Sequence, residues 1–349
     1  MLQRAGHRLK VITYGQSVDQ LAGYDLIRVR GIKHFYDKDG RLSLTRSLFR
    51  NLGAFAYYAT GRRELRRQLA EFSPDVAIVN FEPLVPRIAR SLGVPIVSFD
   101  NQHALLHFPL QVPKGWERSA WITKTAIGLV VQRAEHYVIM ALTPEVTGDP
   151  QVHVVPPVVQ DEVRRVAPSA GSHVLVYLKR PDARFLDILR QSGEQYVIYG
   201  YNRATIDGNL TFRETGDRVH AELGACKAVM GTTGMSLTSE ALWLKKPFFG
   251  VPLKNEFEQM WNATMVKRLD FGDFSEEPTR YAIDHFLRHL GDYRRSLDSY
   301  RFDSDEAGRT LLELIERLPG RATKALSARE LRSRRFRAGR PAPSSHGKS

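Results

Sequence analysis

The sequence predicts an α/β protein with two doubly wound, Rossmann-like domains that face each other across a cleft. Three observations indicate this fold class. Short apolar runs alternate with helical segments along almost the whole chain, which is typical of parallel sheets covered by helices. A length of 349 residues with 42% hydrophobic content is sufficient for two cores. A proline pair, Pro156-Pro157, interrupts the pattern near the middle.

The first domain is expected to cover residues 1–156. Apolar runs of strand length stand at 9–14, 75–80, 94–99 and 137–141. The intervening residues favour helices, at 43–72, 84–92 and 117–135. This order of strand, helix and strand favours parallel pairing.

The second domain is expected to cover residues 157–304 and to repeat the same rhythm. Its strands are predicted at 173–178, 196–199, 228–230 and 247–251, and its helices at 183–191, 217–225 and 235–244. A final helix within 305–320 carries a leucine-rich stripe and should pack onto one of the two domains.

The formal net charge of +13 is concentrated at the C-terminal end of the chain. Residues 321–349 contain nine Lys and Arg against one acidic residue, which leaves only +5 for the rest. Such a basic segment after the last apolar helix predicts a disordered, solvated tail. Its expected partner is anionic lipid, at about 1 kcal/mol per basic residue near the surface. A nucleic-acid partner, which would depend on this tail alone, is not expected.

The chain contains no secretory signal in its first residues and no run of the roughly 18 apolar residues that cross a membrane. We therefore expect a cytoplasmic protein, with a peripheral position at the inner membrane face as a second expectation. The single cysteine, Cys226, excludes an internal disulfide and a cysteine metal site.

The most informative segment joins the strand at 228–230 to the helix that follows. Gly231, Thr232, Thr233 and Gly234 form a small-residue turn, and the helix begins close to Ser236. The first N–H groups of a helix have no acceptor inside it, and its dipole adds about half a positive charge. The turn therefore predicts a diphosphate site, where glycines permit close approach and hydroxyls donate.

Carboxylates and amides further along suit the rest of a nucleotide sugar. Glu240 lies one helical turn beyond the phosphate turn, at a distance that suits the two hydroxyls of a ribose. Glu258, Gln259 and Asn262 stand at the start of the next helix, where sugar hydroxyls could meet them. The alternative is an ordinary strand–helix–strand unit with turn glycines and with Glu240 on a solvated helix face.

Residues 227–263 resemble the GT-B nucleotide-sugar glycosyltransferases, in particular the group related to the peptidoglycan GlcNAc transferase and the UDP-glycosyltransferases. The shared features are the turn 231–234, Ser239-Glu240-Ala241, Pro247 with Pro252, and Glu258-Gln259 with Asn262-Ala263. The resemblance implies that Glu240 binds ribose and that Glu258 and Gln259 bind the donor sugar. It extends loosely from residue 5 to residue 318.

By this resemblance the protein transfers a sugar from a nucleotide-diphosphate donor, with a UDP-sugar expected, to a lipid-linked or cell-envelope acceptor. The nucleotide sugar is a substrate, and no cofactor is expected. The sequence shows no D-x-D pair after a strand and no His/Cys cluster with ligand spacing, so no metal is expected. The helix start would instead stabilise the departing diphosphate.

A base for the acceptor hydroxyl is expected at the carboxyl ends of strands in the first domain, where ligands of open sheets gather. The candidates are Glu82, Asp100 and His103. Two other interpretations stay open: His103 as a hydrogen-bonding or exposed residue, and Asp100 as the cap of the following turn.

In the resembling families a first strand and a Gly-rich loop precede the segment that residues 1–12 match. We therefore expect both to be absent from the first domain, which would leave neighbouring strands with unpaired backbone. A non-catalytic nucleotide-sugar binder with an incomplete acceptor domain is the alternative function. A sugar-nucleotide epimerase of this fold is disfavoured, because 231–236 lacks the acidic residues of the epimerase phosphate loop.

Overall fold

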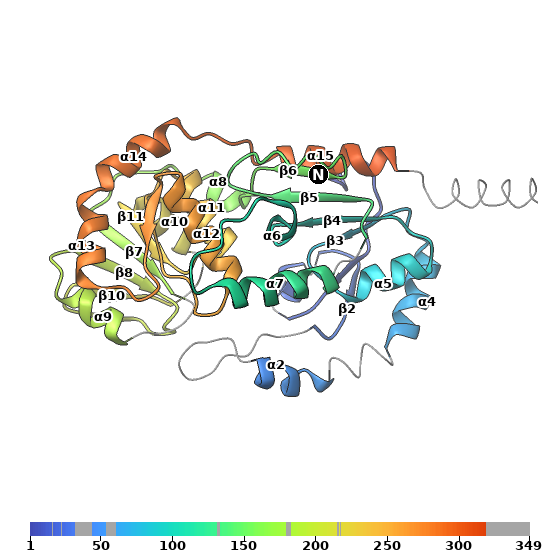
Figure 1. The fold of residues 1–349 in the computed structure, drawn as a ribbon, viewed down its shortest axis with the longest axis horizontal. Helices are drawn as coiled ribbons and strands as arrows, with labels where there is room; N and C mark the ends of the chain where they lie inside the picture. The colour runs from blue at the N-terminus through green and yellow to red at the C-terminus, as the bar shows by residue number, and fades with distance from the viewer. Residues whose placement is uncertain are drawn as a thin grey trace, which may run out of the picture.

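The computed structural model describes residues 1–318, except 16, 22, 32–43, 54–60, 131–132, 179–182, 215 and 217. The predicted tail at 321–349 lies outside these residues. The chain forms two α/β lobes side by side, and the last helix returns across the first lobe (Figure 1). The predicted fold class is confirmed. Within the described part, no helix is long and apolar enough to cross a membrane.

The C-lobe is built on a seven-stranded sheet of order β13-β12-β11-β7-β8-β10-β9. All neighbours pair in parallel except β9, which is antiparallel to β10. The strands are β7 His173–Tyr177, β8 Gln195–Tyr199, β9 Thr205–Asp207, β10 Leu210–Phe212, β11 Ala228–Gly231, β12 Phe248–Gly250 and β13 Gly272–Phe274. The four strands predicted here are present, whereas β9, β10 and β13 are short and were not predicted.

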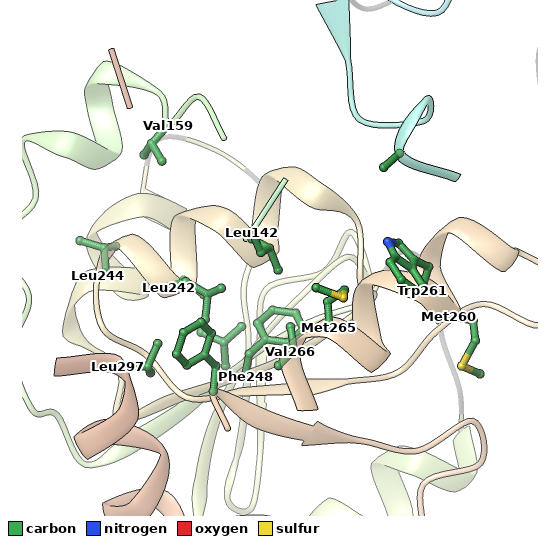
Figure 2. Close-up of a cluster of buried hydrophobic side chains, with 14 of the residues drawn as sticks. Leu142, Val159, Leu242, Leu244, Phe248, Met260, Trp261, Met265, Val266 and Leu297 are labelled. Carbon is green, nitrogen blue, oxygen red and sulfur yellow. The ribbon is translucent and has the colours of Figure 1, made fainter. Parts of the chain in front are cut away.

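Helices cover both faces of this sheet, so its strands are apolar on both sides. Val174 and Val176 of β7 face one core, with Phe286, whereas Leu175 faces the other, with Leu242. Figure 2 shows this second core, where Phe248 lies among side chains from several helices. The helices are α8 Asp161–Arg164, α9 Ala183–Arg190, α10 Arg218–Ala225, α11 Met235–Trp243, α12 Phe257–Arg268, α13 Arg280–Arg288 and α14 Leu290–Ser299.

The strand order reverses between β7 and β11. The chain builds β8 and β10 on one side of β7, and then returns to place β11, β12 and β13 on the other side. The ends of the two strands are aligned, because Gly231 pairs with Tyr177. Ligands of open α/β sheets bind outside the carboxyl ends of strands at such a reversal. The turn 232–234 follows β11 directly and therefore lies at this point.

The N-lobe contains two separate sheets among its described residues. Four parallel strands pair in the order β3-β4-β5-β6, and β1 pairs only with β2. The strands are β1 Val11–Thr13, β2 Leu26–Arg28, β3 Ala77–Val79, β4 Ile96–Asp100, β5 His136–Met140 and β6 Val152–Val155. Strands β2 and β6 were not predicted. Among the described residues β1 and β3 therefore belong to different sheets, and the absence of a first strand stays a prediction.

Two N-lobe helices pack against the sheet of β1 and β2 in one apolar cluster. Leu65 of α4 and Ile88 of α5 pack with Ile12 of β1 and Ile27 of β2. The second of these helices also packs on the four-stranded sheet, where its Ala89 lies with Val79 of β3 and Ile96 of β4. The helices are α1 Ser17–Gln20, α2 Leu44–Arg50, α4 Arg62–Phe72, α5 Leu84–Ser91, α6 Ala104–His107 and α7 Glu117–Val130. The helix predicted over 43–72 corresponds to α2 and α4, with residues 54–60 outside the described part.

The last helix, α15 Glu306–Arg317, packs onto the N-lobe although it follows the C-lobe in sequence (Figure 1). Its Ala307, Leu311 and Leu314 are buried with Val97 of β4 and Val138 of β5. The apolar stripe of this helix therefore ties the chain end to the first lobe, as its leucine pattern predicts.

Candidate functional site

The two glycines of the turn after β11 have different structural roles. A Cβ at Gly231 would lie 2.7 Å from Leu237 Cδ2 and 2.8 Å from the Tyr177 carbonyl oxygen. Glycine is therefore needed there for close packing of β11, β7 and α11. A Cβ at Gly234 would meet no atom within 4 Å. Gly234 precedes α11 without any side-chain cap, so the start of this helix borders open space.

The turn is fixed by α12. The Thr233 hydroxyl donates to the Gln259 carbonyl oxygen at 2.6 Å, and the Asn262 side chain donates to the Thr233 carbonyl oxygen at 2.9 Å. The expectation that the Thr233 hydroxyl faces a phosphate is therefore corrected, since its proton is used inside the protein. Thr232 is half-buried and Ser236 is exposed, and the phosphate-binding role of their hydroxyls stays a prediction.

Glu240 lies on α11 one turn beyond Ser236, and its side chain is only 8% exposed. The interpretation of Glu240 as part of a solvated helix face is therefore wrong. Its carboxylate has no hydrogen-bond or ionic partner among the described residues, and burial raises its pKa to about 7. A buried carboxylate without a partner is unfavourable in an isolated protein. Such residues gather at functional sites.

The three predicted sugar-binding residues of α12 differ in what they contact. Gln259 is used within the lobe: its Oε1 accepts from the Leu253 N–H at 3.1 Å and its Nε2 donates to Glu256 at 2.9 Å. Asn262 holds the turn, as described above. Glu258 reaches the other lobe, and burial raises its pKa. The sugar-binding roles of all three stay predictions.

The lobes are in close contact beside Glu258. An apolar cluster runs from α6 of the N-lobe to α12 of the C-lobe and includes Leu105, Phe108 and Trp261. Trp116 Nε1 donates to Glu276 at 3.0 Å across the same interface. The cavity left between the lobes is about 10 Å³, lined among others by Asn101, Met140, Met235, Glu258 and Asn262.

A larger cavity, of about 370 Å³, lies away from the predicted site residues. The N-terminal segment, the linker after β6 and the start of α15 line it, with Tyr24, Val159 and Leu311 among its residues. Its charged residues pair with each other, because Arg164 forms ion pairs with Asp305 at 2.9 Å and with Asp161 at 3.5 Å. The groups that could bind a ligand, the uncapped helix start and the unpartnered Glu240, are therefore at the switch point and not in this larger cavity.

Asp100 and His103 come together at the end of β4, inside the N-lobe. Asp100 accepts from the His103 backbone N–H at 2.9 Å, and its Oδ2 lies 2.8 Å from His103 Nδ1. His103 is 1% exposed, its ring lies against Tyr137, and its Nε2 is buried without a partner. Asp100 thus fixes the turn after β4, and the pair faces inward instead of into the cleft.

Glu82 acts locally at the start of α5. Its carboxylate accepts from the Leu84 N–H at 2.9 Å and from the Val85 N–H at 2.7 Å. Burial raises its pKa, and these two hydrogen bonds oppose the shift. The contacts are those of a helix cap.

The described residues contain no group of three or more His, Cys, Asp or Glu that could hold a metal ion.

The arrangement of two lobes around a switch-point turn defines a GT-B fold. The family described as glycosyl transferase family 1 matches residues 1–291, and the chain belongs to this family. No curated protein matches the sequence.

Solved glycosyltransferases share the fold at low sequence identity. Arabidopsis thaliana UGT89C1, complexed with UDP-L-rhamnose, has a TM-score of 0.59 at 13% identity over 91% of this chain and 87% of its own. The calicheamicin glycosyltransferase CalG4 has a TM-score of 0.59 at 16% identity over 90% and 91%. Phytolacca americana UGT2, complexed with UDP-2fluoro-glucose and pterostilbene, has a TM-score of 0.60 at 13% identity over 88% and 91%.

Proposed function

We propose that the protein transfers a sugar from a nucleoside-diphosphate sugar, with UDP as the nucleotide, to an acceptor hydroxyl. The observation that carries this proposal is the uncapped start of α11 at the β7–β11 switch point, with unpartnered Glu240 buried on the same helix. A diphosphate can accept from the free N–H groups there and is favoured by the helix dipole. The UDP-sugar complexes of the solved relatives support this choice of donor.

Glu240 supports a ribonucleotide in particular. Glu240 lies one turn beyond Ser236 on α11, and we propose that its carboxylate meets the ribose of a nucleotide whose diphosphate binds at the helix start. Two adjacent ribose hydroxyls can each donate to one of its oxygens. Binding would then give a partner to a carboxylate that has none, which makes the interaction stronger than one with a solvated group.

Transfer breaks the bond between the anomeric carbon and the diphosphate oxygen, while the acceptor oxygen forms a bond to the same carbon. Negative charge grows on the departing diphosphate, and the N–H groups at the start of α11 stabilise it. The Thr232 and Ser236 hydroxyls can donate to the same oxygens. In this proposal the helix start replaces a metal ion.

The acceptor hydroxyl loses its proton to a base, for which the Asp100–His103 pair is the proposed candidate. His103 Nε2 has no partner, and Asp100 holds the other ring nitrogen. Because His103 is 1% exposed, α6 has to move before an acceptor can reach it. In a His103→Gln variant we expect kcat/KM to fall while UDP affinity is kept. Glu82 is a less suitable base, because both its oxygens cap α5.

For the acceptor we propose a lipid-linked or cell-envelope molecule at an anionic membrane surface. The net charge of +13, with most of it in residues 321–349, supports this choice. Flotation with vesicles tests it: we expect the protein to float with phosphatidylglycerol-containing vesicles at low salt and not with neutral phosphatidylcholine vesicles. Equal behaviour with both would contradict a membrane acceptor.

Calorimetric titration with UDP and a transfer assay test the proposed activity together. We expect saturable UDP binding that Glu240→Gln weakens and that the exposed control Glu313→Gln leaves unchanged.

The separation of β1 and β2 from the main N-lobe sheet favours a second candidate, a nucleotide-sugar binder that does not catalyse transfer. Saturable UDP-sugar binding without hydrolysis or transfer would indicate that candidate, and absence of nucleotide binding would contradict both.

A further inference from the structure

The helix α7 has one face inside the protein and one face in solvent. Ala120 and Ile127 are 3% and 1% exposed and pack in the apolar cluster that reaches α12 of the C-lobe. Trp121 and Leu129, by contrast, are 69% and 57% exposed. Their separation corresponds to about two helical turns, so the two side chains lie on the same, outer side of the helix. The outer face of α7 therefore presents large apolar groups to water.

The exposure of Trp121 is unusual within this chain. Trp116 and Trp261 are each 7% exposed, and Trp243 is half-buried. Scattered exposed leucines are common on protein surfaces, whereas tryptophan has a large apolar ring system and is usually mostly covered. Val112, in the segment before α7, adds a further exposed apolar side chain. Trp121 therefore lacks the cover that the other tryptophans have.

Cations surround these apolar residues. Lys114, Arg118 and Lys124 are exposed, and none of their side chains has an ionic or hydrogen-bond partner among the described residues. Glu117 is the only acidic residue in positions 112–130, so positive charge prevails there. Arg118 and Lys124 lie three residues before and after the exposed tryptophan, so they share its side of the helix. The outer face of α7 is therefore both apolar and positively charged.

The shape and charge of this face favour a membrane as its partner. Val112, Trp121 and Leu129 line neither of the two cavities described above, so the face offers no enclosed place for a small molecule. A protein that covered Trp121 would also bury the neighbouring cations, and burying a charge without a partner is costly. At a membrane the cations stay hydrated beside lipid phosphates, while apolar side chains enter about 5–10 Å into the boundary of headgroups and acyl chains. Tryptophan is enriched at this depth.

We propose that the outer face of α7 docks on anionic lipid, with Trp121 and Leu129 in the headgroup region and the three cations on lipid phosphates. This inference rests on the proposed function in one respect, because it names the surface on which a lipid-linked acceptor is met. That surface adjoins the C-lobe, since the Ser119 hydroxyl of α7 donates to the Asn255 carbonyl oxygen at 3.0 Å. An acceptor in the docked membrane would therefore be presented beside the boundary between the lobes.

Residues 321–349 are a separate candidate for lipid contact, because they are basic and follow α15 in the sequence. Helix α15 runs along the upper edge of the N-lobe in Figure 1, whereas α7 crosses its lower part. The two contacts can therefore be removed one at a time.

Vesicle flotation of the full chain at low salt tests the docking face. The vesicles contain phosphatidylcholine alone or phosphatidylcholine with phosphatidylglycerol. The variants are the double change Trp121→Ser with Leu129→Ser, and Arg118→Glu. Their matched controls are Tyr281→Ser and Arg184→Glu, which change an exposed aromatic residue and an exposed cation of the C-lobe. A chain that lacks 321–349 shows what the basic segment contributes, and thermal unfolding shows that each variant is folded.

Tryptophan fluorescence gives a second readout, because Trp121 is the most exposed of the four tryptophans. We expect its emission to move to shorter wavelength with phosphatidylglycerol vesicles and to be quenched by brominated lipids. In a Trp121→Phe variant this shift should be lost while flotation is kept, since phenylalanine retains an apolar ring.

We expect the double variant to bind phosphatidylglycerol vesicles at least about tenfold more weakly and Arg118→Glu about fivefold more weakly, whereas both controls bind as the wild type does. Unchanged flotation of the double variant, or an unshifted Trp121 emission, would overturn the inference. If deletion of 321–349 alone abolished flotation, the inference would fall and the proposed membrane acceptor would stay.

Two further outcomes would also overturn the inference. A wild-type chain that floats with neither vesicle would contradict the membrane acceptor as well, whereas the proposed transfer would still be decided by UDP binding and turnover. A dimer in sedimentation that Trp121→Ser breaks, without vesicle binding, would assign the outer face of α7 to a second copy of the chain.

Discussion

The hydroxyl of Thr233 donates a 2.6 Å hydrogen bond to the carbonyl oxygen of Gln259. This bond joins the turn after β11 to α12, two segments that α11, β12 and a loop separate in the sequence. Asn262 adds a second bond between the same segments. The shape of the phosphate turn is therefore set by the protein before a ligand binds, which reduces the entropy lost on binding.

Replacing Thr233 with Val should destabilise the protein and weaken UDP binding. The Gln259 carbonyl oxygen, which lies inside α12, would lose its side-chain donor, and losing one hydrogen bond costs about 0.5–1.5 kcal/mol. Urea denaturation measures the free energy of unfolding, and calorimetry measures UDP affinity. Thr232→Val is the control, because the Thr232 hydroxyl has no partner in the described residues, and it should reduce affinity without a comparable loss of stability. Unchanged stability of Thr233→Val would contradict this account of the turn.

The two glycines of the turn should respond differently to alanine. Gly231→Ala places a methyl group 2.8 Å from the Tyr177 carbonyl oxygen, so β11 has to shift, and we expect about 1–3 kcal/mol of destabilisation. Gly234 has φ −71° and open space around its Cα, so Gly234→Ala should fold with nearly wild-type stability. Its methyl group borders the helix start and should weaken UDP binding. Thermal unfolding and calorimetry of both variants show whether stability and binding separate in this way.

Replacing Glu240 with Gln should stabilise the unliganded protein at high pH. The pKa of Glu240 is raised from 4.5 to about 7. Between these two values the folded state binds more protons than the unfolded state, so wild-type stability falls as the pH rises. At about 1.36 kcal/mol per pKa unit, the penalty reaches about 3 kcal/mol above pH 7. Urea denaturation at pH 4.5 and pH 8 should show Glu240→Gln equal to the wild type at the lower pH and more stable at the higher.

The same substitution should weaken donor binding by at least about tenfold at pH 8, because hydrogen bonds to a charged group are lost. Wild-type affinity should rise as the pH increases through 7, where Glu240 ionises. UDP-glucose is the suitable probe, since UDP has a terminal phosphate that itself titrates near pH 6. A wild-type affinity that does not change with pH would contradict a ribose contact by Glu240.

Chelation of divalent ions should leave transfer unchanged. The start of α11 and the hydroxyls of Thr232 and Ser236 supply the groups that stabilise the leaving diphosphate in our proposal. Initial rates with and without EDTA, after dialysis against a chelating resin, measure this directly. A loss of activity that Mg²⁺ or Mn²⁺ restores would show that a metal ion is required.

The regular part of the fold could be predicted because it depends on local pattern. Buried parallel strands such as β7 and β11 are continuous apolar runs, and helices such as α9 begin and end close to the predicted residues. Strands β2, β9 and β13 have three residues each and are partly or fully exposed, so they lack the apolar run that marks β12, which is equally short but buried. Their existence depends on neighbours in the sheet.

The phosphate turn and Glu240 could be located from sequence, because strand, glycine turn and helix are contiguous. The partners of Thr233 and Glu258 could not, since they lie 26 and 157 residues away. The inward direction of the His103 side chain could not be predicted from the sequence either, because the side chain of a residue that follows a strand can point into the cleft or back over the sheet. The pattern Asp100-x-x-His103, with an acidic residue three positions before the residue that precedes α6, was the available signal of a cap.

The structure of the complex with UDP tests the central claim most directly. We expect the diphosphate oxygens within hydrogen-bonding distance of the N–H groups at the start of α11, and the ribose hydroxyls on the Glu240 carboxylate. A nucleotide bound elsewhere, for example in the cavity between the linker and α15, with Glu240 still unpartnered, would contradict the assignment of this site.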